Sequence, residues 1–151
     1  MPNSCASLFL SLLLLCVACS GGADSSEQEA PVVIDGIFLS DEGVLERSIG
    51  IATEGGVFTA VIMAGSQQPV SEIRTFSTAV DFQESIAVGV YTGNVEFVED
   101  AELLGRFKIV GIPALSRGVP QIAVTFAVSG DRLTLSAEDK VDGRHYSIEK
   151  R

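Results

Sequence analysis

Basic residues are scarce in this sequence, and tryptophan is missing altogether. Ten Lys and Arg residues stand against twenty Asp and Glu, which gives a formal net charge of −10 at pH 7. So acidic a chain has little with which to displace counterions from a phosphate backbone, and this excludes nucleic acid as a partner. The acidic surface favours solubility. A preference for basic partners is the alternative interpretation.

Charge is also absent from the start of the chain. Residues 8–19, LFLSLLLLCVAC, form an unbroken apolar run that is too short to span a bilayer but has the length of a signal-peptide core. The run ends at Val17-Ala18-Cys19, which resembles the lipobox of bacterial lipoproteins. The resemblance implies a signal peptide over residues 1–18 and lipidation of Cys19. It also implies a membrane anchor in the bacterial cell envelope, outside the cytoplasm, and Ser20 favours the outer membrane. An ordinary secretory signal cut nearby is the alternative.

Cysteine and histidine are rare as well. Cys5 and Cys16 would leave with the signal peptide, so the mature chain would keep only Cys19. An intrachain disulfide and a cysteine-based metal site are then impossible. The single histidine, His145, has no ligand cluster near it in the sequence, and we expect it on a solvated strand. The sequence has no GxSxG, HExxH or CxxC motif, so we expect no enzyme activity, metal or cofactor.

The rest of the chain is dense in strand signals. Residues 19–31 are rich in Gly, Ser and acidic residues and predict a flexible tether. From residue 32 onward, short runs of apolar alternation are separated by turns, and only AELLGRF, residues 101–107, is a plausible helical turn. The pattern predicts one all-β domain over residues 32–151, a β-sandwich of about eight antiparallel strands. We expect strands at Val32–Leu39, Val44–Ala52, Val57–Ala64, Ile73–Val80, Ser85–Thr92, Arg106–Ile112, both arms of a hairpin over 122–135, and Arg144–Glu149.

One long segment resembles a known family. Residues 104–143, LGRFKIVGIPALSRGVPQIAVTFAVSGDRLTLSAEDKVDG, resemble the signature of the seventy-kilodalton heat-shock chaperones of the DnaK type, in the β half of their substrate-binding domain. The upstream segments SIGIATEGGVFTAVI and RTFSTAVDFQESIAVGVYTG are similar to the same family. The resemblance runs from about Val44 to the end of the chain. It implies a DnaK-like peptide-binding sandwich, without the family's ATPase domain and α-helical lid.

The resemblance also implies a site. In the family, an extended peptide lies in a channel formed by loops above the sandwich, and one side chain fills a central apolar pocket. Main-chain hydrogen bonds hold the peptide, which is strand-type recognition. Thr53 and Ser77 would offer backbone contacts, and Glu54 and Ala79 would form the two halves of an arch over the peptide. The residues that correspond to the pocket walls are Ile51, Val57, Phe76, Ile86 and Val88.

Two residues depart from the family pattern. Glu54 stands where the family has a large apolar residue, and an unpaired carboxylate is costly to bury. We expect Glu54 to point to solvent, leave the arch open, and favour ligands with Lys or Arg beside the central apolar residue. Phe82 stands in a loop where the family is polar. It is either an added apolar contact for the ligand or a packed anchor of its loop.

Three functions remain open at this point. The first is ATP-independent binding of extended hydrophobic segments by a holdase-like module that takes unfolded polypeptides and uses no nucleotide. The second is a scaffold for protein–protein contacts in the envelope, with a degenerate groove. The third is a substrate-binding piece detached from an ATP-dependent chaperone.

Overall fold

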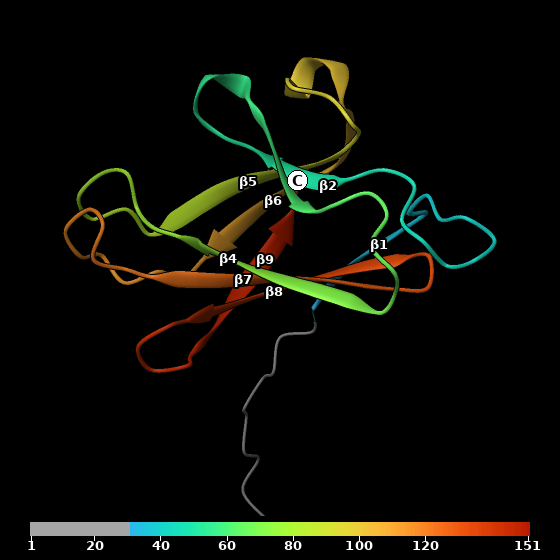
Figure 1. The fold of residues 1–151 in the computed structure, drawn as a ribbon. Coiled ribbons are helices and arrows are strands. Elements are labelled where there is room, and N and C mark those ends of the chain that lie inside the picture. Colours follow the sequence, from blue (N-terminus) through green and yellow to red (C-terminus); the bar gives the residue numbers. More distant parts are fainter. Residues whose placement is uncertain (1–30) are drawn as a thin grey trace, which may run out of the picture.

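The computed structural model describes residues 31–151, which form a β-sandwich without an α-helix (Figure 1). This confirms the predicted fold class. The predicted signal peptide, Cys19 and most of the predicted tether lie outside the described residues. Within the described part no helix is long and apolar enough to cross a membrane. The strands are β1 (Val32–Asp35), β2 (Ile49–Ala52), β3 (Phe58–Ile62), β4 (Val70–Phe76), β5 (Ser85–Thr92), β6 (Glu102–Val110), β7 (Ile122–Ser129), β8 (Arg132–Asp139) and β9 (His145–Lys150).

Every strand pair is antiparallel. Hydrogen-bonded neighbours follow the order β3-β2-β5-β6-β9-β8-β7-β4, and β1 pairs with β8 off this path. One layer holds β3, β2, β5 and β6, and the other holds β4, β7, β8 and β1 (Figure 1). Strand β9 pairs with β6 over one part and with β8 over another, so it connects the two layers.

The β7–β8 hairpin shows why this sequence folds as it does. Ile122, Val124, Phe126 and Val128 alternate along β7, and all four are buried, as are Leu133 and Leu135 on β8. Phe126 lies opposite Leu135 and Val128 opposite Leu133, so each cross-strand pair contributes two apolar side chains to the same face. The turn between Ser129 and Arg132 places Gly130 at φ 62°, a left-handed conformation that glycine adopts without strain.

The core lies between the two layers and continues to both of their ends. Its largest fully buried side chains come from β2, β3, β5, β6, β7 and β8 and from the segment before β2, so both layers contribute. They are Leu45, Ile49, Ile62, Val90, Phe107, Ile109, Ile122, Phe126, Val128 and Leu133. All the described strands and this core lie within residues 32–150.

Two details of the sequence interpretation are corrected. The only helical turn expected was at residues 101–107, but residues 102–107 belong to β6, and the nearby 3-10 turn is Val98–Asp100. Cross-strand pairing with β5 decides this, since residues 102–110 extend along residues 85–92. The strand expected at residues 73–80 runs instead from Val70 to Phe76, because Ser77 and Thr78 bond to the 111–121 loop.

Candidate functional site

Four loops surround the candidate site, two inner and two outer. The inner loops are residues 53–57, between β2 and β3, and residues 77–84, between β4 and β5. The outer loops are residues 93–101 and 111–121, which connect β5 to β6 and β6 to β7. In Figure 1, loops 53–57 and 93–101 rise together above the sandwich, and loops 77–84 and 111–121 project together to one side.

The outer loop 93–101 supports the inner loop 53–57. Val57 forms an isolated strand bridge with Phe97, and the Phe58 amide donates a hydrogen bond to the Glu96 carbonyl at 2.9 Å. Thr53 closes the inner loop from within, because its amide and its hydroxyl both donate to the Val57 carbonyl, at 3.0 and 3.2 Å. Loop 53–57 is therefore a tight turn fixed at its base and on its outer side.

The other inner loop, 77–84, is supported more extensively. The Ser77 hydroxyl donates to the Pro120 carbonyl at 2.7 Å, and the Gly118 amide donates to the Thr78 carbonyl at 3.0 Å. Further along, the Phe82 amide donates to the Leu115 carbonyl at 2.8 Å. The Arg117 amide donates to the Asp81 carboxylate at 2.9 Å. These contacts hold loop 77–84 against loop 111–121 along its whole length.

Gln83 holds loop 77–84 from inside. Its side-chain oxygen accepts hydrogen bonds from the Ala79 and Val80 amides at 3.0 and 3.3 Å, and its side-chain nitrogen donates to the Ser85 carbonyl at 2.6 Å. The sequence interpretation assigned Gln83 no role. The available signal was an amide side chain two residues before a strand, a position from which it can satisfy the backbone of its own loop.

Four of the predicted pocket walls lie together. Ile51, Ile86 and Val88 belong to the buried core, with exposed fractions of 6, 8 and 7%, and Phe76 packs against it half-buried. Ile51 lies opposite Val90 on β5, so it shares the inward face with Ile86 and Val88. These four side chains, which we call the rim cluster, sit near the ends of β2, β4 and β5 from which the inner loops emerge.

The remaining predicted residues lie on the inner loops and are exposed. Val57 is 38% exposed, and its backbone bridges to Phe97 on the outer loop. Thr53, Glu54, Ser77 and Ala79 are also exposed. Thr53 and Ser77 use their hydroxyl groups within the loop system, while Glu54 makes no hydrogen bond or ion pair with any described residue.

Across the described part of the chain, no hydrogen bond, ion pair or strand bridge connects loop 53–57 with loop 77–84. Glu54 and Ala79 therefore form no polar latch. Each inner loop is fixed to its outer neighbour and free of the other inner loop, so the two can separate without the loss of a hydrogen bond.

Phe82 takes an unusual conformation. It is the non-glycine residue with positive φ in the described chain, at 59°, and its side chain is 71% exposed. A residue held in the left-handed region carries backbone strain, which persists only where neighbouring contacts impose it. In Phe82 that contact is the hydrogen bond from its amide to the Leu115 carbonyl. The sequence left two interpretations of Phe82, an added apolar contact for the ligand or a packed anchor of its loop. The packed anchor is wrong for the side chain, because the ring faces solvent.

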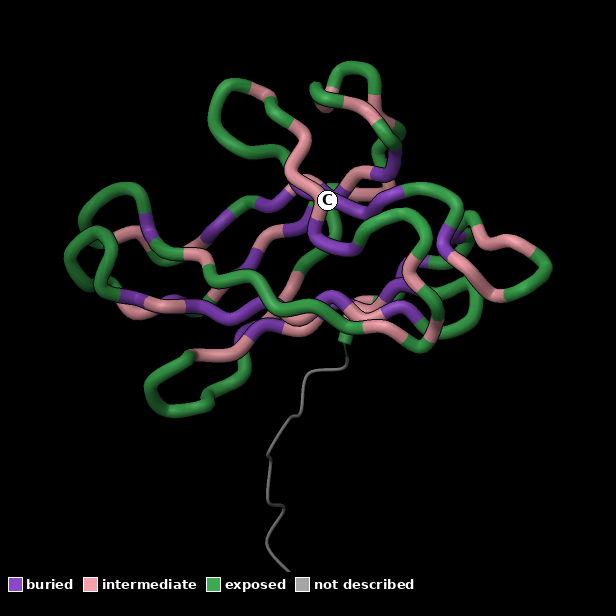
Figure 2. Tube along the Cα trace, in the orientation of Figure 1, coloured by how far each residue is buried: buried purple, intermediate pink, exposed green. Residues whose placement is uncertain are grey.

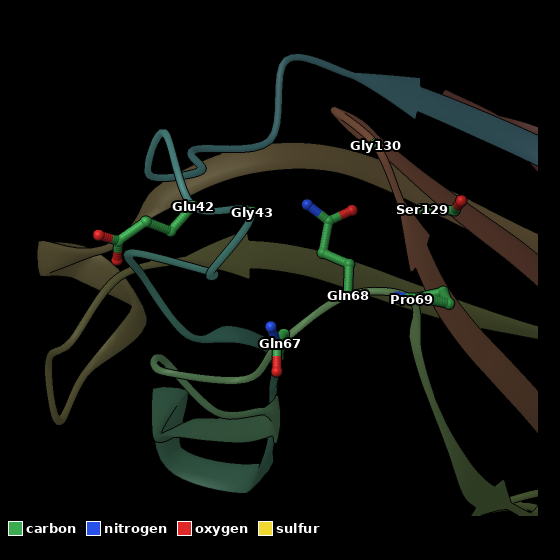
Figure 3. A pocket seen from close by; sticks show the side chains of 7 residues that line it. All are labelled: Glu42, Gly43, Gln67, Gln68, Pro69, Ser129 and Gly130. Atoms are coloured by element: carbon green, nitrogen blue, oxygen red, sulfur yellow. The ribbon is translucent and has the colours of Figure 1, made fainter.

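Several hollows lie on the described surface, and one of about 460 Å³ is lined by residues of both loop 77–84 and loop 111–121, among them Glu84 and Ile112. A smaller one of about 250 Å³ includes Ala52, Ala87, Val88 and Tyr91 and opens on the outer face of β5, away from the core. Another of about 310 Å³ lies between the β3–β4 connection, residues 42–43 and the β7–β8 turn (Figure 3). There the Gln68 side chain points into the hollow, and its buried oxygen has no hydrogen-bond partner among the described residues. None of the predicted site residues lines the hollow of about 310 Å³.

Comparison with protein families decides the relationship of the chain. The family model described as Hsp70 protein matches residues 26–151, which includes every described strand and all four loops. The chain belongs to the Hsp70 family. Family membership implies that the ligand is a polypeptide, and the two pairs of loops at the end of an Hsp70-family sandwich are where we look for it.

Proposed function

We propose that this Hsp70-family domain binds extended hydrophobic segments of unfolded polypeptides, without nucleotide, between loops 53–57 and 77–84. The observation that supports this most is the rim cluster: apolar side chains that retain slight exposure at the point where two firmly supported but mutually unconnected loops diverge. An apolar side chain of the ligand would rest on Ile51, Ile86, Val88 and Phe76. Thr53 and Ser77 would present backbone groups beside it.

The energetics set limits on such a site. Filling a pocket with one aliphatic side chain contributes about 1.5–3 kcal/mol. Micromolar affinity requires roughly 8 kcal/mol, so main-chain hydrogen bonds and neighbouring side chains must contribute the rest. Because Ile51, Ile86 and Val88 are each less than one-tenth exposed, the inner loops must also move apart on binding. Binding of this kind is passive and quickly reversible, as in a holdase.

The proposal includes a cellular context. Cys19 would carry the lipid after removal of residues 1–18, and residues 19–31 would hold the domain off a membrane of the bacterial envelope. That compartment lacks ATP, which agrees with a module that binds its ligand without nucleotide.

A titration tests the binding function. A fluorescently labelled heptapeptide with a central Leu is added to residues 31–151, and anisotropy is followed. We expect saturable binding that Val57→Asp weakens at least fivefold, because Val57 is exposed on loop 53–57, which would form one wall of the proposed channel. Val33→Asp is the matched control: Val33 is 45% exposed on β1, which pairs with β8, and its substitution should leave binding unchanged. No binding at high peptide concentration would refute the proposal.

The scaffold function is the second candidate, and one observation favours it. Ile51, Ile86 and Val88 are buried deeply enough to serve as ordinary core residues. If the inner loops do not separate, the domain would keep the sandwich and contact an envelope partner through its surface. Absence of peptide binding together with retained folding would support this function.

A further inference from the structure

Strand β4 has one edge without a partner. It stands last in the strand order and pairs only with β7, from Val70 opposite Val128 to Phe76 opposite Ile122. Among the described residues, no backbone hydrogen bond reaches its other edge. Residues 71–75 are all exposed (Figure 2), although Arg74 reaches across to the Ala60 carbonyl on β3. The edge of β3 differs, because the segment around Glu96 and Phe97 already occupies its beginning.

The sequence of β4, VSEIRTF, is complementary to itself when read in reverse. In an antiparallel pair of two β4 strands centred on Ile73, Glu72 of each copy lies opposite Arg74 of the other. Ile73 then faces its own equivalent, Ser71 faces Thr75, and Val70 faces Phe76. Directly opposite residues in such a pair have Cβ atoms about 4.5–5.5 Å apart, close enough for ion pairs and apolar contacts. A parallel in-register pair would instead place Glu72 against Glu72.

The side chains at the centre of β4 are poorly used in the single chain. Glu72 makes no hydrogen bond or ion pair with any described residue. Arg74 makes one long contact, 3.4 Å from its guanidinium nitrogen to the Ala60 carbonyl. Ile73 is 55% exposed. Charged residues on an edge strand often prevent pairing with other chains, but here their order makes them attract a second copy.

We propose that this domain forms a two-fold symmetric dimer through β4, in which the β7–β4 layer of one copy continues into that of the next. The interface is isologous, since each copy supplies the same strand, and two Glu72–Arg74 pairs fix its register. The edge groups of both strands gain hydrogen-bond partners, and the two Ile73 side chains cover each other. The dimer proposal does not rest on the peptide-binding function, although β4 also carries Phe76 of the rim cluster.

Charge variants test the dimer by sedimentation over a wide concentration range, on residues 31–151 and on the full chain in mild detergent. Wild-type protein should dimerise. Glu72→Arg and Arg74→Glu each create two like-charged pairs and should weaken the dimer roughly tenfold or more. An equimolar mixture of the two variants restores both opposite-charge pairs and should form a heterodimer. The double variant Glu72→Arg/Arg74→Glu should dimerise like the wild type.

Two results would overturn the proposal. One is a monomeric wild type at every concentration; the other is a pair of single variants that dimerise as well as the wild type does. Hydrogen exchange gives a second readout that needs no variant. Amides on the outer edge of residues 70–76 should become protected as protein concentration rises, and unchanged exchange there would also contradict the dimer.

Discussion

Glu54 is expected to set which residues the domain prefers beside the central apolar side chain of its ligand. Its carboxylate is exposed on loop 53–57 and has no partner among the described residues, so a cation on the ligand can reach it without breaking an existing pair. The informative substitution is Glu54→Gln, which removes the charge and keeps the size. Its comparison is Glu42→Gln, another exposed glutamate, on a loop beside the β7–β8 turn.

The magnitude follows from exposure. An ion pair at the surface is worth about 0.2–1 kcal/mol, which corresponds to roughly 1.4- to 5-fold in Kd. We expect wild-type protein to bind a Leu-centred peptide with a flanking Lys more tightly than one with a flanking Gln, by a factor in this range. Glu54→Gln should abolish the difference, and Glu42→Gln should keep it. Raising the ionic strength should also reduce it, because exposed charges are screened over about 8–10 Å.

The assay is competition anisotropy with three heptapeptides that differ only in the flanking residue: Lys, Gln or Glu. A Glu flank should bind more weakly than Gln in the wild type and equally in Glu54→Gln. If Glu54→Gln retained the full preference for Lys, the carboxylate would not face the ligand, and the open arch that we infer from its exposure would be wrong.

Three further predictions concern stability and anchoring. The Tyr146 hydroxyl donates to the Asp139 carboxylate at 2.6 Å, and this bond and the Val141 amide lower the pKa of Asp139, while burial raises the pKa of Tyr146 to about 12. Tyr146→Phe should therefore cost about 1–2 kcal/mol at pH 7. The deficit should shrink as the pH falls below 3.8 and through the lowered pKa of Asp139, because the protonated carboxyl loses the stabilising charge in the wild type. Urea unfolding at pH 7 and at a pH below 3.8 measures the deficit, and a constant deficit would refute this prediction. Gly50→Ala should destabilise by about 1–3 kcal/mol, because its Cβ would lie 2.5 Å from the Thr59 carbonyl oxygen; an unchanged urea midpoint would contradict the packing of β2 on β3. Cys19→Ser should move the protein from the detergent phase to the aqueous phase when the two are separated by detergent phase partitioning. The same substitution should abolish incorporation of labelled fatty acid, and continued incorporation would exclude Cys19 as the lipidated residue.

Alternation in the sequence was enough to predict the sandwich and its central hairpin. Each apolar residue on β7 needs only its neighbours at i ± 2 to be assigned a face, so Ile122 to Val128 were placed correctly. The residues at which strands begin and end were harder to predict. The fourth strand was expected at residues 73–80, but it begins at Val70 and ends at Phe76, because Ser77 and Thr78 bond to the 111–121 loop instead of to a neighbouring strand.

The candidate site was predictable only through the family resemblance. Without it, Ile51, Ile86 and Val88 read as ordinary strand residues, and their burial agrees with that reading as well as with a closed pocket. The contacts that join each inner loop to its outer neighbour could not be predicted at all. They consist of contacts between residues some forty positions apart, such as Ser77 with Pro120, and no local pattern encodes such pairs.

The central claim is that an apolar ligand side chain settles on the rim cluster. Its most direct test is a methyl NMR titration of the Ile- and Val-labelled domain with the Leu-centred heptapeptide. Our account predicts that the methyl signals of Ile51, Ile86 and Val88 shift, while those of Val128, at the far end of the core, do not. Shifts confined to other residues, or no shifts at peptide saturation, would contradict it.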